Sequence, residues 1–222
     1  MVRETDHYCG EPAMDTDEVW RAVEAERAGL ADLFDDLSER EWATPSLCAG
    51  WRVREVAAHL TLAHTGPGRA VVDLVRAGGS FDRMIRDTAI RRAALPTDRY
   101  APLLRAMIGS RRRAPGVSPL EPLLDALVHG QDIAVPLGRP RDMPLAAAAA
   151  AVDRVWPNLF PFRAARRLRG YRLRATDHPW AAGDGELVEG PLAALLLLIT
   201  GRRAAALARL DGPGARRLAA TP

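Results

Sequence analysis

Two side chains four residues apart, Asp125 and His129, are the clearest candidates for chemistry in this 222-residue sequence. Both lie in a segment predicted to be a helix, and residues four apart share one face of a helix. A carboxylate and an imidazole on one face can bind the same divalent cation. A third ligand from another helix would give a catalytic type of metal site, which keeps a position open, whereas structural sites use four protein ligands.

Asp132 follows His129 by about one helical turn and can hold the His129 ring by accepting a hydrogen bond from it. The alternative is that these three polar residues are simply solvated. Periodicity alone favours that alternative, because a leucine stripe on another face marks the side that packs in the core. The stripe consists of Leu120, Leu123, Leu124 and Leu127.

Two histidines, His59 and His64, are candidates for a third ligand on a second predicted helix. The apolar face of that helix accommodates His64, whereas His59 lies at its edge beside Arg52 and Glu55. An edge position suits the rim of a pocket, but spacing alone does not choose between the two. Among the other histidines, His7 and His178 have no partners at an informative spacing, and we expect them to be exposed or structural.

The elements that must position these residues are mainly helical. Apolar spacing predicts helices at 15–43, 51–63, 69–76, 81–95, 100–113, 119–137 and 144–155. After residue 156, alternating polar and apolar residues predict a strand at 171–176, and a glycine-rich turn separates it from a partner strand at 186–189. A strongly apolar helix at 192–200 and a short helix at 202–210 follow. We therefore expect a flexible tail (1–14), a helical bundle (15–155) and a small C-terminal α+β domain (156–222), a mainly α fold.

Composition limits the classes of partner. The formal net charge is only +3, which does not favour a strong nucleic-acid binder, although a sequence pI near 9.4 leaves room for a local basic patch. All 31 basic residues are arginine. The apolar runs are too short for a membrane span, and the N-terminus has no apolar signal-peptide core. We expect a soluble cytoplasmic protein with no nucleic-acid or membrane partner.

Two segments resemble a known family. Pro45-Ser46-Leu47-Cys48-Ala49-Gly50-Trp51, continuing to Ala58-His59-Leu60, and Val128-His129-Gly130-Gln131-Asp132-Ile133 with Pro136-Leu137-Gly138 are similar to motifs of the mycothiol-dependent maleylpyruvate isomerase family. That family is part of the DinB-like group of metal-binding four-helix bundles. The C-terminal residues 175–180 and 190–202 resemble the end of the same family, so the resemblance covers nearly the whole chain after Met14.

The resemblance implies that the metal ligands are His59, Asp125 and His129. Family members have a glutamate where this chain has Asp125, which is shorter by one methylene, so the ion would lie closer to the helix or a water would intervene. The substrate-contacting arginine of the family corresponds to Arg202, with the adjacent Arg203 as an alternative. Arg202 can also be explained as a solvent-exposed residue at a helix N-terminus.

The implied chemistry is thiol activation. A bound divalent cation deprotonates a coordinating thiol, and zinc is the default ion for two imidazoles and a carboxylate. In the family the thiol is mycothiol, a cysteinyl pseudo-disaccharide of actinobacteria, and the arginine-only composition is consistent with such a host. The other substrate would be a small electrophile. An isomerase adds the thiolate to a double bond, permits rotation and releases it, whereas an S-transferase leaves it attached. We expect a monomer or homodimer.

The cysteines of the chain are not required for this chemistry. Cys9 and Cys48 have neither disulfide-type nor metal-type spacing. Cys48 lies in a motif turn, where we expect a packed rather than a reactive thiol.

Two other functions remain open from the sequence. One is a non-catalytic binding or regulatory module that retains the bundle, with a basic stretch for an acidic partner. That stretch contains Arg163, Arg166, Arg167, Arg169, Arg172 and Arg174. The other is a thiol-independent metal hydrolase.

Overall fold

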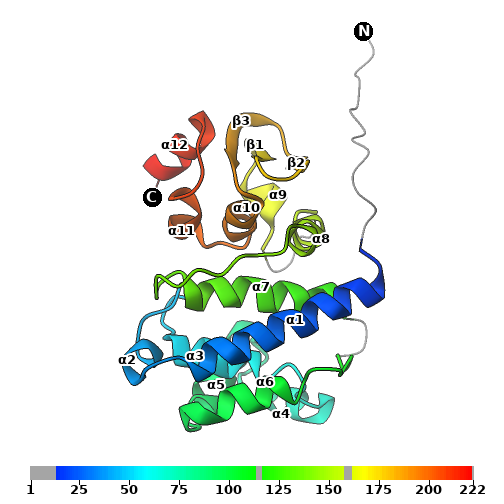
Figure 1. Cartoon of the computed structure of the whole chain (residues 1–222). Helices are drawn as coiled ribbons and strands as arrows, with labels where there is room; N and C mark the ends of the chain where they lie inside the picture. The colour runs from blue at the N-terminus through cyan, green and yellow to red at the C-terminus, as the bar shows by residue number, and fades with distance from the viewer. Residues whose placement is uncertain (1–13, 114–116, 158–161, 222) are drawn as a thin grey trace. The chain divides into compact units, whose positions relative to one another are not determined.

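The computed structural model describes residues 14–113, 117–157 and 162–221 (Figure 1). Nearly all of the predicted tail at 1–14, including His7 and Cys9, lies outside the described residues. The chain divides into two compact units, Thr16–Asp142 and a C-terminal unit that begins at Met143. None of the helices in the described part of the chain is long and apolar enough to cross a membrane.

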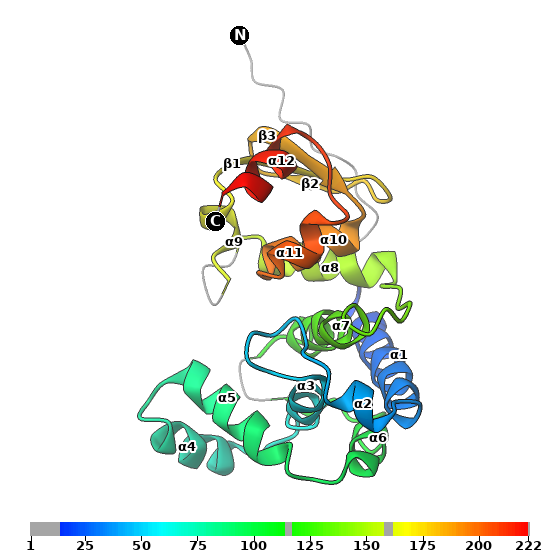
Figure 2. The ribbon, with the colours of Figure 1, turned by 90° about the vertical axis from the view of Figure 1, so that its left-hand side faces the viewer.

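Four helices form the centre of the N-terminal unit. They are α1 (Thr16–Asp35), α3 (Val53–Leu60), α6 (Tyr100–Arg105) and α7 (Leu120–Ala134). Helix α1 packs against α6 and α7, and α3 packs against the same two helices, which closes a four-helix arrangement (Figure 2). Because α7 contacts both α1 and α3, it is buried on more than one side. The remaining elements are α2 (Glu39–Trp42), α4 (Pro67–Arg76), α5 (Phe81–Arg92) and a 3-10 turn at Thr97–Arg99.

Two predicted helices of this unit end much earlier than expected. The helix expected at 15–43 ends at Asp35, because Ser38 starts the separate helix α2 with a capping box. The Ser38 hydroxyl accepts from the Glu41 N–H, and the Glu41 carboxylate accepts from the Ser38 N–H at 2.9 Å. The helix expected at 100–113 ends at Arg105, and the turn that follows is held by the buried Arg27, which donates to the Met107 carbonyl oxygen.

The division between the units falls after Asp142, earlier than the boundary at 155 and 156 favoured by the sequence. Helix α8 (Leu145–Val155) packs against α10 (Leu192–Ile199) and therefore belongs to the C-terminal unit. Every residue of α10 except Ala193 is buried, so its strongly apolar surface needs covering on several sides. The alanine-rich α8 supplies a flat partner surface that permits close packing.

The C-terminal unit contains a three-stranded sheet in the order β2-β1-β3. Strand β1 (Gly170–Ala175) pairs in parallel with β3 (Gly185–Gly190), with Leu173 opposite Val188. The short β2 (Ala181–Ala182) pairs antiparallel with the other edge of β1. The two strands predicted from the sequence therefore pair as expected, and β2 supplies the reversal that makes their pairing parallel. The unit also contains α9 (Ala164–Arg167), α11 (Arg203–Leu207) and α12 (Pro213–Ala220), of which α9 and α12 were not predicted.

Candidate metal centre

Helix α7 carries the three candidate residues Asp125, His129 and Asp132, and their side chains differ strongly in burial. The side chain of Asp125 is 35% exposed, that of His129 is 15% exposed, and that of Asp132 is fully buried. The interpretation of these residues as a solvated face is therefore wrong for Asp132 and His129. The cause is that α7 packs against both α1 and α3, and the 44–52 loop also reaches Asp132, so helical periodicity with a single core face does not describe it.

His59 on α3 meets the same face of α7. Its Nε2 lies 3.3 Å from Oδ1 of Asp125, and Nε2 of His129 lies 3.4 Å from the same oxygen. The two imidazole rings meet edge to face, with centroids 4.9 Å apart. The Trp51 ring, 5.5 Å from the His59 ring, packs beside it. His64 is half-buried and does not join this group.

These three residues fit a divalent cation. One ligand atom from each of His59, Asp125 and His129 lies within 4.8 Å of the others. Ligand atoms 2.0–2.1 Å from a tetrahedral zinc ion are about 3.3 Å apart, which matches both nitrogen–oxygen separations at Asp125. Two neutral imidazoles and a carboxylate are also a donor set that zinc accepts.

A second set of contacts holds the opposite edge of the His129 ring. The Nδ1 atom lies 2.8 Å from Oδ2 of the buried Asp132. The Cys48 thiol donates to the same oxygen at 3.0 Å, and its sulfur is 3.7 Å from His129 Nδ1. A carboxylate that accepts from Nδ1–H leaves the Nε2 lone pair directed at the metal.

The loop that carries Cys48 is held in place by its own hydrogen bonds. The Ser46 hydroxyl donates to the Trp51 carbonyl oxygen at 2.8 Å, and the Cys48 N–H donates to Ser46 Oγ at 3.1 Å. The Leu47 N–H donates to the Asp132 carbonyl oxygen, which ties the loop to α7. The motif turn thus positions a packed thiol against Asp132, and Cys48, His129 and Asp132 form a second group of potential ligand atoms within 4.8 Å.

The electrostatics of the centre favour a positive charge between its carboxylates. Burial opposes ionisation of Asp125, but the two neighbouring imidazoles outweigh it and hold the pKa of Asp125 well below its ordinary value of 3.8. Burial likewise lowers the pKa of His129, but hydrogen bonds with Asp125, Asp132 and Cys48 outweigh it, so the pKa is raised well above 6.5. An environment that stabilises a proton on His129 also suits a cation shared by the same ligands.

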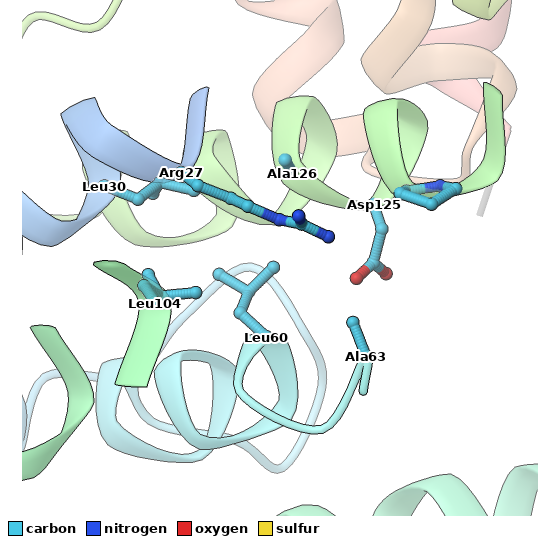
Figure 3. Close-up of a pocket in the computed structure, with 8 residues that line it drawn as sticks. Arg27, Leu30, Leu60, Ala63, Leu104, Asp125 and Ala126 are labelled. Atoms are coloured by element: carbon cyan, nitrogen blue, oxygen red, sulfur yellow. The ribbon is translucent and has the colours of Figure 1, made fainter. Parts of the chain in front are cut away.

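Sequence reasoning missed Arg27, which lines a small cavity beside Asp125 (Figure 3). Arg27 is only 4% exposed, although it is charged. It lies on the apolar stripe of α1, between Val23 and Leu30. A charged residue within an otherwise apolar stripe is the signal that could have identified it, because a buried charge requires a partner.

Arg202 lies in the C-terminal unit, immediately before α11. Its Nη1 donates to the Thr200 carbonyl oxygen at 2.8 Å, and the side chain is half-buried. The adjacent Arg203 donates to the carbonyl oxygens of Leu218 and Thr221. Substrate contact by Arg202 therefore stays a prediction, and Arg203 serves the packing of its own unit.

Comparison with known proteins supports the similarity seen in the motifs. Residues 23–121 match the family model described as "Mycothiol maleylpyruvate isomerase N-terminal domain". The resemblance predicted from the sequence is confirmed. The match includes His59 and Arg27 and ends four residues before Asp125. No curated protein sequence matches the chain.

Two solved structures have the same fold. The crystal structure of the mycothiol-dependent maleylpyruvate isomerase superposes with a TM-score of 0.64 at 13% identity, covering 91% of this chain and 94% of that chain. A histidine-to-alanine mutant of that enzyme gives a TM-score of 0.62 at 14% identity with the same coverage. The mainly α, DinB-like bundle with a small C-terminal α+β part is thus the fold of this chain. At these identities the comparison shows the architecture, and the chemistry must be argued from the site.

Proposed function

We propose that this chain is a metal-dependent enzyme that activates the thiol of mycothiol for isomerisation of, or S-transfer to, a small electrophile. The observation that carries the proposal is the convergence of His59, Asp125 and His129, from two helices, within 4.8 Å. A divalent cation held there would lower the pKa of a thiol and keep the thiolate beside a Lewis acid.

The protein's own residues supply orientation. Asp132 accepts from His129 and sets the tautomer of its ring. Trp51 packs against His59 and covers one side of that ring. Asp125 is the most exposed of the three proposed ligands, so we place the approach of thiol and electrophile on its side of the site.

The first substrate to test is maleylpyruvate, because the two similar solved structures are of an enzyme that isomerises it. S-transfer is the alternative outcome for the same centre. Both reactions begin with a thiolate attacking an electrophilic carbon. They differ in whether the carbon–sulfur bond breaks again, so analysis of the product separates them.

Metal analysis tests the centre itself. Purified wild type should contain close to one equivalent of a divalent ion, with zinc as our first expectation. His59→Ala and His129→Ala should each reduce the affinity for the ion on the order of a thousandfold. Each removes one of three protein ligands from a site whose free energy of metal binding is about 10 kcal/mol or more. His64→Ala is the matched control and should retain the ion. A wild type as metal-free as His59→Ala would contradict the proposal.

Thermal unfolding with mycothiol tests thiol use. At about 100 times its dissociation constant, a ligand of the folded state adds about 2.7 kcal/mol of stability. Wild type should show this stabilisation, and a test electrophile should turn over only when mycothiol is present. Turnover without any thiol would indicate a metal hydrolase instead.

A binding module for an acidic partner has less support. Within the basic stretch at 163–174, Arg167 donates to the carbonyl oxygens of Leu198 and Ile199, and Arg174 pairs with Glu189. These two arginines are therefore engaged in packing their own unit. Salt-sensitive partner binding that survives His129→Ala would favour the module.

A further inference from the structure

A small cavity adjoins the candidate metal centre on the side of Asp125 (Figure 3). Its two charged lining residues are Arg27 and Asp125, and the others are apolar, including Leu60, Ala63 and Leu104. The cavity therefore places one cation and one carboxylate in apolar surroundings, where charge interactions are stronger than in water.

The Arg27 guanidinium enters this cavity with one edge free. Its Nη1 donates to the carbonyl oxygens of Met107 at 2.9 Å and Ser110 at 3.4 Å. Its Nε and Nη2 make no hydrogen bond with any residue that the structure describes. Nε and Nη2 lie on one edge of the guanidinium and form the two-donor fork that matches a carboxylate. Figure 3 shows the guanidinium directed toward Asp125 across the cavity.

Arg27 and Asp125 face each other without forming an ion pair within the described part of the chain. Asp125 nevertheless acts on Arg27, because its negative charge opposes the lowering of the Arg27 pKa by burial. If Asp125 binds a cation, as proposed above, its charge is neutralised by that cation. The buried Arg27 then loses the larger of the two negative charges that act on it, that of Asp125, and keeps only that of Glu24. Arginine does not relieve this by losing a proton.

We propose that Arg27 is the carboxylate-binding residue of the site, holding an anionic oxygen group of the electrophile through its Nε and Nη2 edge beside Asp125. This inference rests on the proposed function and extends it to a residue that selects and positions the substrate. The alternative is that Arg27 serves only to hold the turn after α6 through Met107 and Ser110. The two roles use different edges of the guanidinium and can be separated.

Calorimetric titration of the zinc-loaded protein provides the test, with maleate as the anionic probe and maleic diamide as its neutral counterpart. Wild type should bind maleate more tightly than the diamide. Arg27→Gln should weaken maleate binding at least tenfold and leave diamide binding unchanged, because it removes the charge and the fork. When the substrate is an electrophile that bears a carboxylate, Arg27→Gln should raise KM more than it lowers kcat.

Arg54→Gln is the matched control. Arg54 is half-buried and, like Arg27, donates to a carbonyl oxygen distant in sequence, that of Leu95 at 2.7 Å, but it does not line the cavity. Both variants should lower the melting temperature, and only Arg27→Gln should lower maleate affinity. Arg27→Lys provides a second readout should Arg27→Gln not fold, because an ammonium keeps the charge without the fork. It should weaken maleate binding at least threefold.

The outcomes are distinguishable from failure of the proposed function. If wild type binds zinc but Arg27→Gln or Arg27→Lys binds maleate as tightly as wild type, Arg27 is only a structural residue and this inference is wrong. The same holds if wild type prefers the neutral diamide. If wild type binds no zinc, the proposed function fails, and the carboxylate site fails with it because Arg27 then retains Asp125 as its counter-charge.

Discussion

The two edges of the His129 ring have different environments. On the Nε2 edge, the ring faces Asp125 and His59, whose side chains are 35% and 17% exposed. On the Nδ1 edge, it faces Asp132, which is fully buried, and the thiol of Cys48. One edge is therefore more accessible to exchangeable groups, whereas the other faces the buried Asp132 and the half-buried Cys48 of the 44–52 loop.

This contrast suggests a division of labour within one side chain. An imidazole that binds a metal reversibly needs one nitrogen held in a defined tautomer and the other free to coordinate. Burial strengthens the hydrogen bond that holds Nδ1, because water does not compete for it. The edge that does not face the metal thus determines how well the other edge can bind it, and substitutions on the two edges should have different effects.

The largest expected effect on the buried edge comes from Asp132→Ala. The ring of His129 loses the acceptor for Nδ1, so we expect the affinity for zinc to fall tenfold to hundredfold, the usual range for residues that support a metal ligand. A chelator competition titration measures this affinity. Asp73→Ala is the control, because Asp73 is also a buried carboxylate of the N-terminal unit and accepts from Arg69 and Arg91.

Asp73→Ala should lower stability without changing zinc affinity. If Asp132→Ala also lowers stability alone and binds zinc as wild type does, the buried edge does not support the metal centre. The difference between the two edges of the ring would then affect packing alone and not metal binding.

A smaller effect is expected from Cys48→Ala. Asp132 keeps its hydrogen bond with His129 in this variant, so zinc affinity should change by less than about threefold. Unfolding should become easier by about 1 kcal/mol through loss of the thiol hydrogen bond, as measured by urea denaturation. Cys48→Ser should recover part of that stability. A tenfold loss of zinc in Cys48→Ala would instead identify the sulfur as a ligand and reverse the roles of the two edges.

The sequence was most informative where chemistry and motif coincide. The motifs, compared with a known family, pointed to His59, Asp125 and His129, and the structure brings them within 4.8 Å. The burial of Asp132 was not predictable from one helix, because it results from two packed helices and a loop. Arg27 was missed for a related reason, since the apolar residues around it defined its stripe as core.

The differences between the predicted and the observed elements have physical causes that can be identified. Whether a predicted helix continues through a polar segment depends on caps such as Ser38 with Glu41, which end one helix and begin another. The sequence favoured placing α8 with the bundle, whereas in the structure α8 packs against α10. An alanine-rich helix has a surface that packs well against many partners, so its own residues do not identify the partner. The partner of α8 is determined by α10, which is distant in sequence and whose strongly apolar surface must be buried.

The smallest expected effect concerns the support of the loop rather than either edge of the ring. Glu41 accepts from Ser38 and pairs with Arg139, and these hydrogen bonds lower its pKa from 4.5 to about 2. A lowered pKa means that its contribution to stability is present above pH 4.5 and is lost as the pH falls toward 2. Because the Glu41 side chain is still 25% exposed to solvent, we expect less than about 1 kcal/mol. Glu41→Gln should therefore be slightly less stable than wild type near neutrality, with a difference in stability that shrinks in acid and an unchanged zinc affinity.

Urea unfolding at several pH values measures this difference, with Glu39→Gln as the control. A difference that grows in acid would show that the Ser38–Glu41 cap does not stabilise the segment that leads into the loop.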